Sequence, residues 1–113
     1  MKNNHASPKT RRANGSRMRQ NQTQERELLS ALKAFKNGDF TARLPEDWSG
    51  ISGQIAETFN KVIETNQRLA KELERITRSV GKEGRITERA SLGNLSNCWA
   101  EAIGSVNDLI GNL

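Results

Sequence analysis

The middle of the chain carries an unbroken seven-residue repeat, which constrains the possible folds more than any other feature. Its positions alternate steps of four and three residues from Ile55 to Val80. This stepping is typical of a coiled-coil helix, and residues 53–80 would span roughly 42 Å at 1.5 Å per residue. A short preceding helix cannot cover such a stripe, so we expect a partner chain to cover it. The repeat positions, here called the seam, are Ile55, Phe59, Val62, Asn66, Leu69, Leu73, Ile76 and Val80.

Asn66 is the one polar residue of this seam. It can be a tolerated residue at the solvent edge of the helix. Alternatively, two facing asparagines can fix the register and number of strands of a coiled coil, at some cost in stability. The sequence leaves both interpretations open.

A shorter amphipathic helix is predicted over residues 23–37. The Asn37-Gly38 pair supplies a left-handed stop, because glycine adopts positive φ without a steric penalty. Residues 38–52 contain glycine, proline and small polar residues, and therefore predict a connector. The seam positions of this first helix are Leu28, Leu32 and Phe35.

The same order of helix, connector and helix occurs a second time. Gly38 matches Gly84 at an offset of 46 residues, and Phe59-Asn60 matches Val106-Asn107 at 47. An internal repeat of this length indicates an array of similar modules. We expect one unit over residues 23–75 (second helix 53–75) and a divergent unit over 69–113, in which the shared helix ends at 80. A connector over 81–95 and a helix over 96–113 complete the second unit, with seam positions Trp99, Ile103, Val106 and Ile110.

Charge separates the first 22 residues from the rest. The chain has a net charge of +5, yet residues 1–22 contain six basic and no acidic side chains, which leaves residues 23–113 at −1. This segment has no periodic apolar residues, so it is predicted to be a disordered basic tail. A loose contact with nucleic acid or anionic lipid through the tail is the alternative, whereas the remainder offers no basic face for nucleic acid.

The residues that most catalytic and metal sites need are scarce. Cys98 is the only cysteine and His5 the only histidine, so an intramolecular disulfide is excluded and no metal site is predicted. GKEGR at 81–85 lacks the Ser or Thr and the earlier glycine of a phosphate-binding loop. Glu72 and Glu74 lie beside basic residues, where solvated pairing on a helix flank is expected. No catalytic residue, cofactor or small-molecule substrate is predicted, and no apolar run is long enough to span a membrane.

These motifs together resemble the HAMP domain, the signal-relay module of sensor histidine kinases and chemoreceptors. The family pattern is a connector of the form Gly-x-apolar-x-x-x-apolar and a second helix with an early Gly and a Phe-Asn pair. Residues 38–44 read GDFTARL and residues 53–60 read GQIAETFN. The second copy has Gly84, Ile86 and Ala90 in its connector and Val106-Asn107 in its helix. The sequence of these segments is similar to that of the tandem HAMP arrays of soluble hybrid histidine kinases.

The resemblance implies an all-α fold in which two concatenated HAMP units form a parallel, homodimeric four-helix coiled coil. It also implies that connector residues hold each connector to the bundle. Ala90 is a short side chain for this purpose, so the second unit is expected to pack less firmly. The implied connector anchors are Gly38, Phe40, Leu44, Gly84 and Ile86.

The function that the resemblance implies is a non-catalytic, cytoplasmic relay in a two-component system. Its partners would be a second copy of the chain, and other HAMP units or a histidine kinase output domain. Because the last predicted helix runs to Leu113 and no kinase domain is present, we expect a fragment or stand-alone remnant of a hybrid histidine kinase. A static coiled-coil scaffold and a nucleic-acid contact through the basic tail are the alternatives.

Overall fold

The computed structural model describes residues 8–113, with side chains described from Gly15 onward, and is helical throughout its regular parts. No strand occurs within this range, so the all-α prediction is confirmed for the described residues. The chain divides into two compact units, unit 1 up to Asn60 and unit 2 from Lys61 to Leu113. The helices are α1 (Pro8–Lys36), α2 (Gly50–Ile76), the π-helix η1 (Thr77–Lys82) and α3 (Cys98–Gly111).

Helix α1 begins at Pro8, fifteen residues before the predicted start at Thr23. The predicted disorder is therefore wrong for residues 8–22, and residues 1–7 lie outside the described range. Proline suits the first position of a helix because its missing N–H would have no intrahelical partner there. The Arg, Gln, Met and Ala residues that follow have favourable helix propensity. The prediction relied on apolar periodicity, which this segment lacks, and therefore missed the helix.

The end of α1 has the geometry that its sequence predicted. Gly38 has φ of +88°, and its N–H donates to the Phe35 carbonyl at 2.9 Å. The N–H of Asp39 donates to the Ala34 carbonyl, also at 2.9 Å. These two bonds form a Schellman motif, which satisfies carbonyls left open at the helix end.

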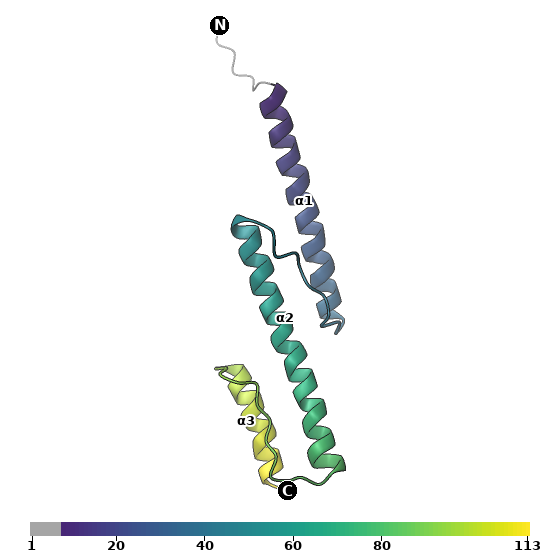
Figure 1. Cartoon of the computed structure of the whole chain (residues 1–113), viewed down its shortest axis with the longest axis vertical. Coiled ribbons are helices and arrows are strands. Elements are labelled where there is room, and N and C mark those ends of the chain that lie inside the picture. The colour runs from purple at the N-terminus through teal and green to yellow at the C-terminus, as the bar shows by residue number, and fades with distance from the viewer. Residues whose placement is uncertain (1–7) are drawn as a thin grey trace. The chain divides into compact units, whose positions relative to one another are not determined.

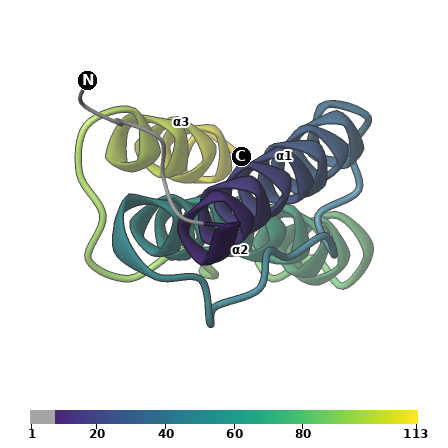
Figure 2. The same cartoon turned by 90° about the horizontal axis from the view of Figure 1, so that it is seen from above.

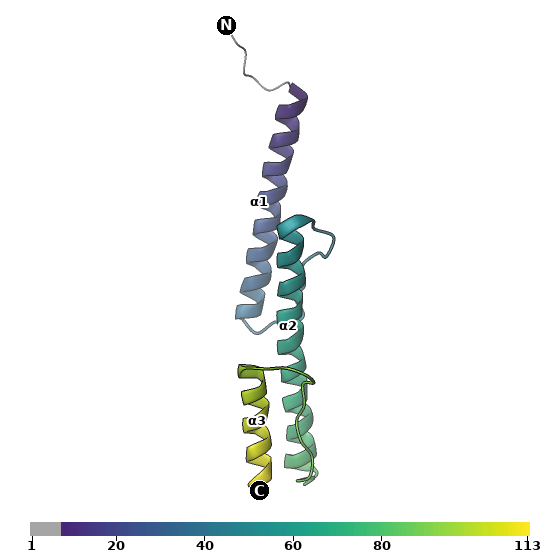
Figure 3. The same cartoon turned by 90° about the vertical axis from the view of Figure 1, so that its left-hand side faces the viewer.

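In unit 1, α1 and the first part of α2 run in the same direction (Figures 1 and 3). The connector of residues 37–49 therefore has to return along the helices, and Figure 2 shows it passing on one side of the pair. Gly53 lies in the first turn of α2, and the Trp48 carbonyl oxygen occupies the place that a Cβ would take there. Glycine is needed here because a Cβ would overlap that oxygen.

The core of unit 1 is built around three phenylalanines. The Phe35 ring makes edge-on contacts with Phe40, at 5.4 Å between centroids, and with Phe59, at 6.3 Å. Such T-shaped pairs are favourable because the positive ring edge faces the negative ring face. Ala31, Leu44 and Ala56 are buried in the same unit. Phe35 and Phe40 thereby fix the end of α1 and the start of the connector to α2.

In unit 2, the second part of α2 and α3 also run in the same direction, and the connector of residues 83–97 returns alongside α2 (Figure 3). Its core contains the buried residues Ile76, Ala90 and Ile110. Val80, Ile103 and Val106 pack against this core and are partly buried. The bounds of this connector and of α3 lie within two residues of the predicted ones.

The π-helix η1 accommodates one extra residue between the buried helix residue and the positive-φ glycine, compared with the end of α1. Buried Ala31 and Ile76 are 45 positions apart, whereas the positive-φ residues Gly38 and Gly84 are 46 apart. The closing bond is also wider, because the Arg85 N–H reaches back six residues to the Ser79 carbonyl at 3.0 Å. A π-helix takes up such an insertion locally, since its hydrogen bonds run from residue i+5 to i.

Replacing Gly53 with alanine is expected to lower the free energy of unfolding by about 1–3 kcal/mol, because the new methyl group displaces the Trp48 carbonyl. Gly104→Ala in α3 is the matched control, since a Cβ there meets nothing within 4 Å. It should raise stability by about 0.5–1 kcal/mol through helix propensity. Urea unfolding of the full chain measures the free energy of unfolding of both variants. Equal changes for the two substitutions would contradict the close contact between the Trp48 carbonyl and position 53.

Candidate functional site

Asn60 fastens the connector of unit 1 to helix α2. Its Oδ1 accepts the Leu44 N–H at 2.8 Å, and its Nδ2 donates to the Leu44 carbonyl at 3.0 Å. Both residues are buried, with exposed fractions of 8% and 4%. Buried backbone groups need partners, and one side-chain amide here supplies both a donor and an acceptor.

Asn107 fastens the connector of unit 2 in the same way. Its Oδ1 accepts the Ala90 N–H at 2.7 Å, and its Nδ2 donates to the Ala90 carbonyl at 3.1 Å. Ala90 is 46 positions after Leu44, and Asn107 is 47 positions after Asn60. We call each pair of bonds an asparagine clamp.

An arginine in each connector makes a second matching set of bonds. Arg43 Nη1 donates to the carbonyls of Phe40 and Ala42 at 2.9 and 2.7 Å. Arg89 Nη1 donates to the carbonyls three and one residues before it, again at 2.9 and 2.7 Å. Because the positive-φ glycine, the arginine and the asparagine clamp all recur, the two connectors share one local structure.

The predicted anchors have different fates in the two units. Leu44 is buried and Phe40 is half-buried against Phe35. Ile86 is 54% exposed within the chain, in contrast to the burial expected of a connector anchor. The position matching Phe35 is Val80, which offers no aromatic ring for Ile86 to contact. Ala90 and Leu92 are the buried connector residues of unit 2 instead.

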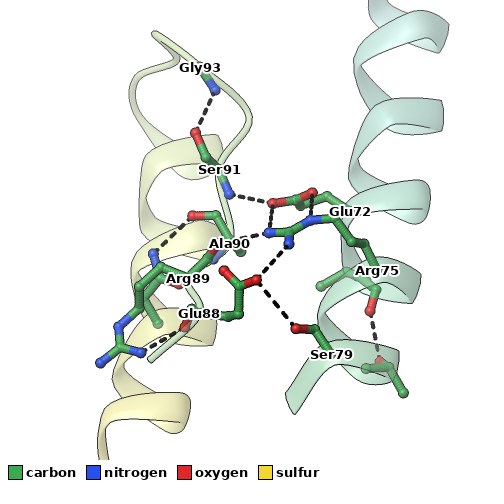
Figure 4. Close-up of polar contacts among 11 residues, drawn as sticks. Glu72, Arg75, Ser79, Glu88, Arg89, Ala90, Ser91 and Gly93 are labelled. Carbon is green, nitrogen blue, oxygen red and sulfur yellow. Dashed lines mark hydrogen bonds and ion pairs between the residues drawn. The ribbon is translucent and has the colours of Figure 1, made fainter. Parts of the chain in front are cut away.

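Unit 2 holds its connector with a polar cluster that Figure 4 shows between α2 and residues 88–93. At its centre, the Glu72 carboxylate accepts the Ser91 N–H at 2.7 Å. It also accepts two bonds from Arg75, at 2.9 Å from Nε and 3.0 Å from Nη2. The Glu72 side chain is 15% exposed, so the expectation of a solvated glutamate is wrong for Glu72. It holds for Glu74, which is 72% exposed in its pair with Arg78.

Arg75 extends the cluster to the connector backbone. Its Nη2 donates to the Arg89 carbonyl at 2.9 Å, and its Nη1 lies 3.8 Å from Glu88 Oε1. The buried Ser79 hydroxyl donates to the same Glu88 oxygen at 3.5 Å. About two turns before Arg75 on α2, Arg68 Nη2 donates to the Leu92 carbonyl at 2.6 Å. Helix α2 therefore contacts the backbone of Arg89, Ser91 and Leu92 through charged side chains.

The charges in this cluster stabilise one another. Hydrogen bonds from Arg75 lower the pKa of Glu72 below its ordinary value of 4.5; burial opposes this shift, and the Ser91 N–H adds to it. The pKa of Arg75 is raised, chiefly by its hydrogen bonds to Glu72. Both groups are thus held in their charged forms, as expected for a bidentate pair.

The seam of α2 divides into a buried and an exposed part. Phe59 and Ile76 are buried, whereas Ile55, Val62 and Leu73 are about 40% exposed within the chain. In the other helices, Ile110 is buried and Leu32 is 45% exposed. The half-buried members of the predicted seams are Leu28, Phe35, Asn66, Leu69, Val80, Trp99, Ile103 and Val106.

Asn66 Nδ2 donates to the Val62 carbonyl one turn earlier, at 2.9 Å. The seam prediction missed Ala56 and Ile63, which are fully buried on α2. Their spacing of seven residues carries the signal that could have found them, as a second apolar stripe beside the seam.

Other features add no further candidate. Within residues 8–113, no group of three or more His, Cys, Asp or Glu side chains could hold a metal ion. In the same range, no helix has the length and apolar character needed to cross a bilayer. No protein-family model matches the chain, and no solved structure matches it.

Removing an asparagine clamp is expected to cost more than removing an ordinary surface amide. Asn60→Ala leaves the buried Leu44 N–H and carbonyl without partners, which should lower the free energy of unfolding by on the order of 2–3 kcal/mol. Asn107→Ala should have a similar effect. Asn66→Ala is the matched control, because that side chain bonds only to its own helix. Denaturant unfolding compares the stability of the three variants. An equal loss of stability in Asn66→Ala and in the two clamp variants would contradict a special role for the clamps.

Proposed function

We propose that the chain is a non-catalytic signal-relay module that transmits a change of helix packing from one unit to the other. The observation that carries this proposal is the recurrence of the same connector attachment in both units, while helix α2 contributes residues to each. A coiled coil that served only as a spacer would not need the same pair of hydrogen bonds to hold a connector in each of its two units. The resemblance of residues 38–60 to HAMP domains supports the same interpretation.

The proposed working form is a parallel homodimer in which four helices pack around the seam. Support comes from apolar side chains that remain exposed in the single chain, among them Leu32, Ile55, Val62 and Leu73. A second copy would bury this stripe, at roughly 25 cal/mol per Å² of apolar surface removed from water. Two parallel copies would place each seam residue opposite its equivalent, an arrangement with which a continuous seven-residue repeat is compatible.

The proposed mechanism uses the shared helix. A packing change in unit 1 alters the rotation or stability of α2, and unit 2 responds because residues 61–76 of the same helix form part of it. Such coupling requires two packing states whose populations an input shifts. The proposed setting is a cytoplasmic two-component system, with other HAMP units or a histidine kinase output domain as partners. The exposed seam alone supports a static coiled-coil scaffold equally well, so the experiments must separate the two.

The dimer is tested by sedimentation equilibrium of the full chain at micromolar concentration, which should give a dimer. The double variant Val62→Gln/Leu73→Gln should shift the equilibrium toward monomer by tenfold or more, because both side chains are exposed within one chain. The control Glu64→Gln/Glu74→Gln changes exposed positions of the same helix and should remain dimeric. A folded monomer of the unmodified chain would overturn the dimer proposal.

The parallel arrangement can be measured with a spin label at the end of the seam, because Cys98 is the single cysteine of the chain and can be replaced by serine. A label on Lys82→Cys in the Cys98→Ser background is expected to give one short distance between the two copies of a parallel dimer. An antiparallel dimer paired along the seam would place the two labels at its opposite ends, roughly 40 Å apart at 1.5 Å per residue.

The relay is tested by asking whether a change in unit 1 is felt in unit 2. Asn60→Ala removes the first clamp, and hydrogen exchange of the Ala90 N–H reports on the second. A relay predicts that Ala90 exchange changes several-fold while the chain stays folded and dimeric. An effect confined to residues 37–60 would instead favour the static scaffold.

A further inference from the structure

The two connectors differ in what holds them beyond the shared clamp. In unit 1 the clamped residue is Leu44, which is buried, and the same unit contains the aromatic cluster of Phe35, Phe40 and Phe59. In unit 2 it is Ala90, which is much smaller, and the charged cluster around Glu72 lies beside it (Figure 4). Apolar burial does not depend on ionisation, whereas a carboxylate bridge does.

Unit 1 cannot form the same bridge. Ser91, whose N–H donates to Glu72, is matched 46 positions earlier by Pro45, which has no N–H. Arg75 is matched 45 positions earlier by Ser30, which carries no charge. The glutamate itself has a counterpart, Glu27, but that residue is exposed. The partners of the carboxylate, rather than the carboxylate itself, are specific to unit 2.

We propose that Glu72 is a charge-dependent latch that holds residues 89–91 on helix α2, so that neutralising it releases the connector of unit 2 while unit 1 stays intact. The ionised carboxylate acts directly on the Ser91 N–H and indirectly through Arg75, which it orients toward the Arg89 carbonyl. Protonation removes the charge that holds Arg75 and weakens both attachments. The inference concerns this cluster alone and does not rest on the relay function.

The charged groups around Glu72 define when the latch opens. Arg75 and Arg68 on α2 and Glu88 and Arg89 on the connector contact this stretch of backbone or belong to it, and from α3 the neutral Asn107 bonds to Ala90. Because the pKa of Glu72 is lowered in the folded chain, its stabilisation is complete above about 4.5. It is lost as the pH falls below that value and through the lowered pKa. Arg75 stays charged over this range, so Glu72 is the group that responds.

The test is NMR-detected exchange of single amides in the full chain, corrected for the intrinsic pH dependence of exchange. Glu72→Gln should speed exchange of the Ser91 N–H at least tenfold at pH 6–7. The Leu44 N–H of unit 1 should change less than twofold. Glu74→Gln is the matched control on the same helix, because its pair with Arg78 is exposed, and it should leave both amides unchanged. Glu88→Gln should have a smaller effect than Glu72→Gln, since its contact with Arg75 is longer.

Acidification tests the latch without any substitution. Lowering the pH from 6 through the lowered pKa of Glu72 should reduce Ser91 protection in the unmodified chain, with the same midpoint as the Glu72 carboxyl carbon shift. Leu44 protection should persist over that range. The latch is overturned if Glu72→Gln behaves like Glu74→Gln. It is equally overturned if Ser91 and Leu44 lose protection together, which would indicate general destabilisation.

Discussion

Both units depend on the hydrogen bonds between an asparagine side chain and the backbone of a connector. Because the two helices of each unit run in the same direction, the connector must return along them without strand or helix partners of its own. Its buried N–H and carbonyl groups therefore lack the usual backbone ladder. A primary amide offers both a donor and an acceptor, so one side chain satisfies both groups of Leu44 in unit 1 and of Ala90 in unit 2. Aspartate or serine could not replace both bonds with the same geometry.

The remaining attachment of the connector differs between the units, and unit 2 combines the smaller anchor with the charged cluster. Leu44 carries three more carbon atoms than Ala90, worth about 2 kcal/mol at ~0.8 kcal/mol per buried methylene-sized group. Glu72 and Arg75 attach the connector of unit 2 through the Ser91 N–H and the Arg89 carbonyl. Because Arg75 is 44% exposed, solvent screens part of its attraction to Glu72. The connector of unit 1 is therefore held by the burial of Leu44, which does not depend on ionisation. The connector of unit 2 is held in part by the Glu72 carboxylate, which does.

Sequence patterns predicted the end of α1 and the positions of α2 and α3, because those features are local. Seam spacing placed α2 and α3, and the Asn37-Gly38 pair placed the Schellman motif at the end of α1. The pairing of Asn60 with Asn107 was also visible as a repeat, although the bonds that these side chains make were not. The four-helix dimer and the HAMP relationship stay predictions that the single chain does not test.

What the sequence did not reveal depends on residues far apart along the chain. Glu72 and Arg75 are three residues apart on one helix, a spacing that normally indicates a solvated surface pair. Their role appears only when Ser91, nineteen positions away, brings its N–H to the carboxylate. Likewise, residues 8–22 carry no apolar pattern, so periodicity could not distinguish an exposed helix from disorder, and intrinsic propensity was the only available signal.

The π-helix explains the first of the two shifts in the offset between the copies, from 45 to 46 residues. An extra residue inserted into an α-helix would rotate everything after it by about 100°, moving the connector to a different face. In η1 the wider turn absorbs that residue between Ile76 and Gly84. Ile76 thus keeps the buried position of Ala31, and Gly84 still starts its connector as Gly38 does. The offset between the units consequently grows from 45 in the helices to 46 in the connectors and 47 at the clamping asparagines. No single offset aligns the two copies, although the bonds that define each unit recur to within 0.1 Å.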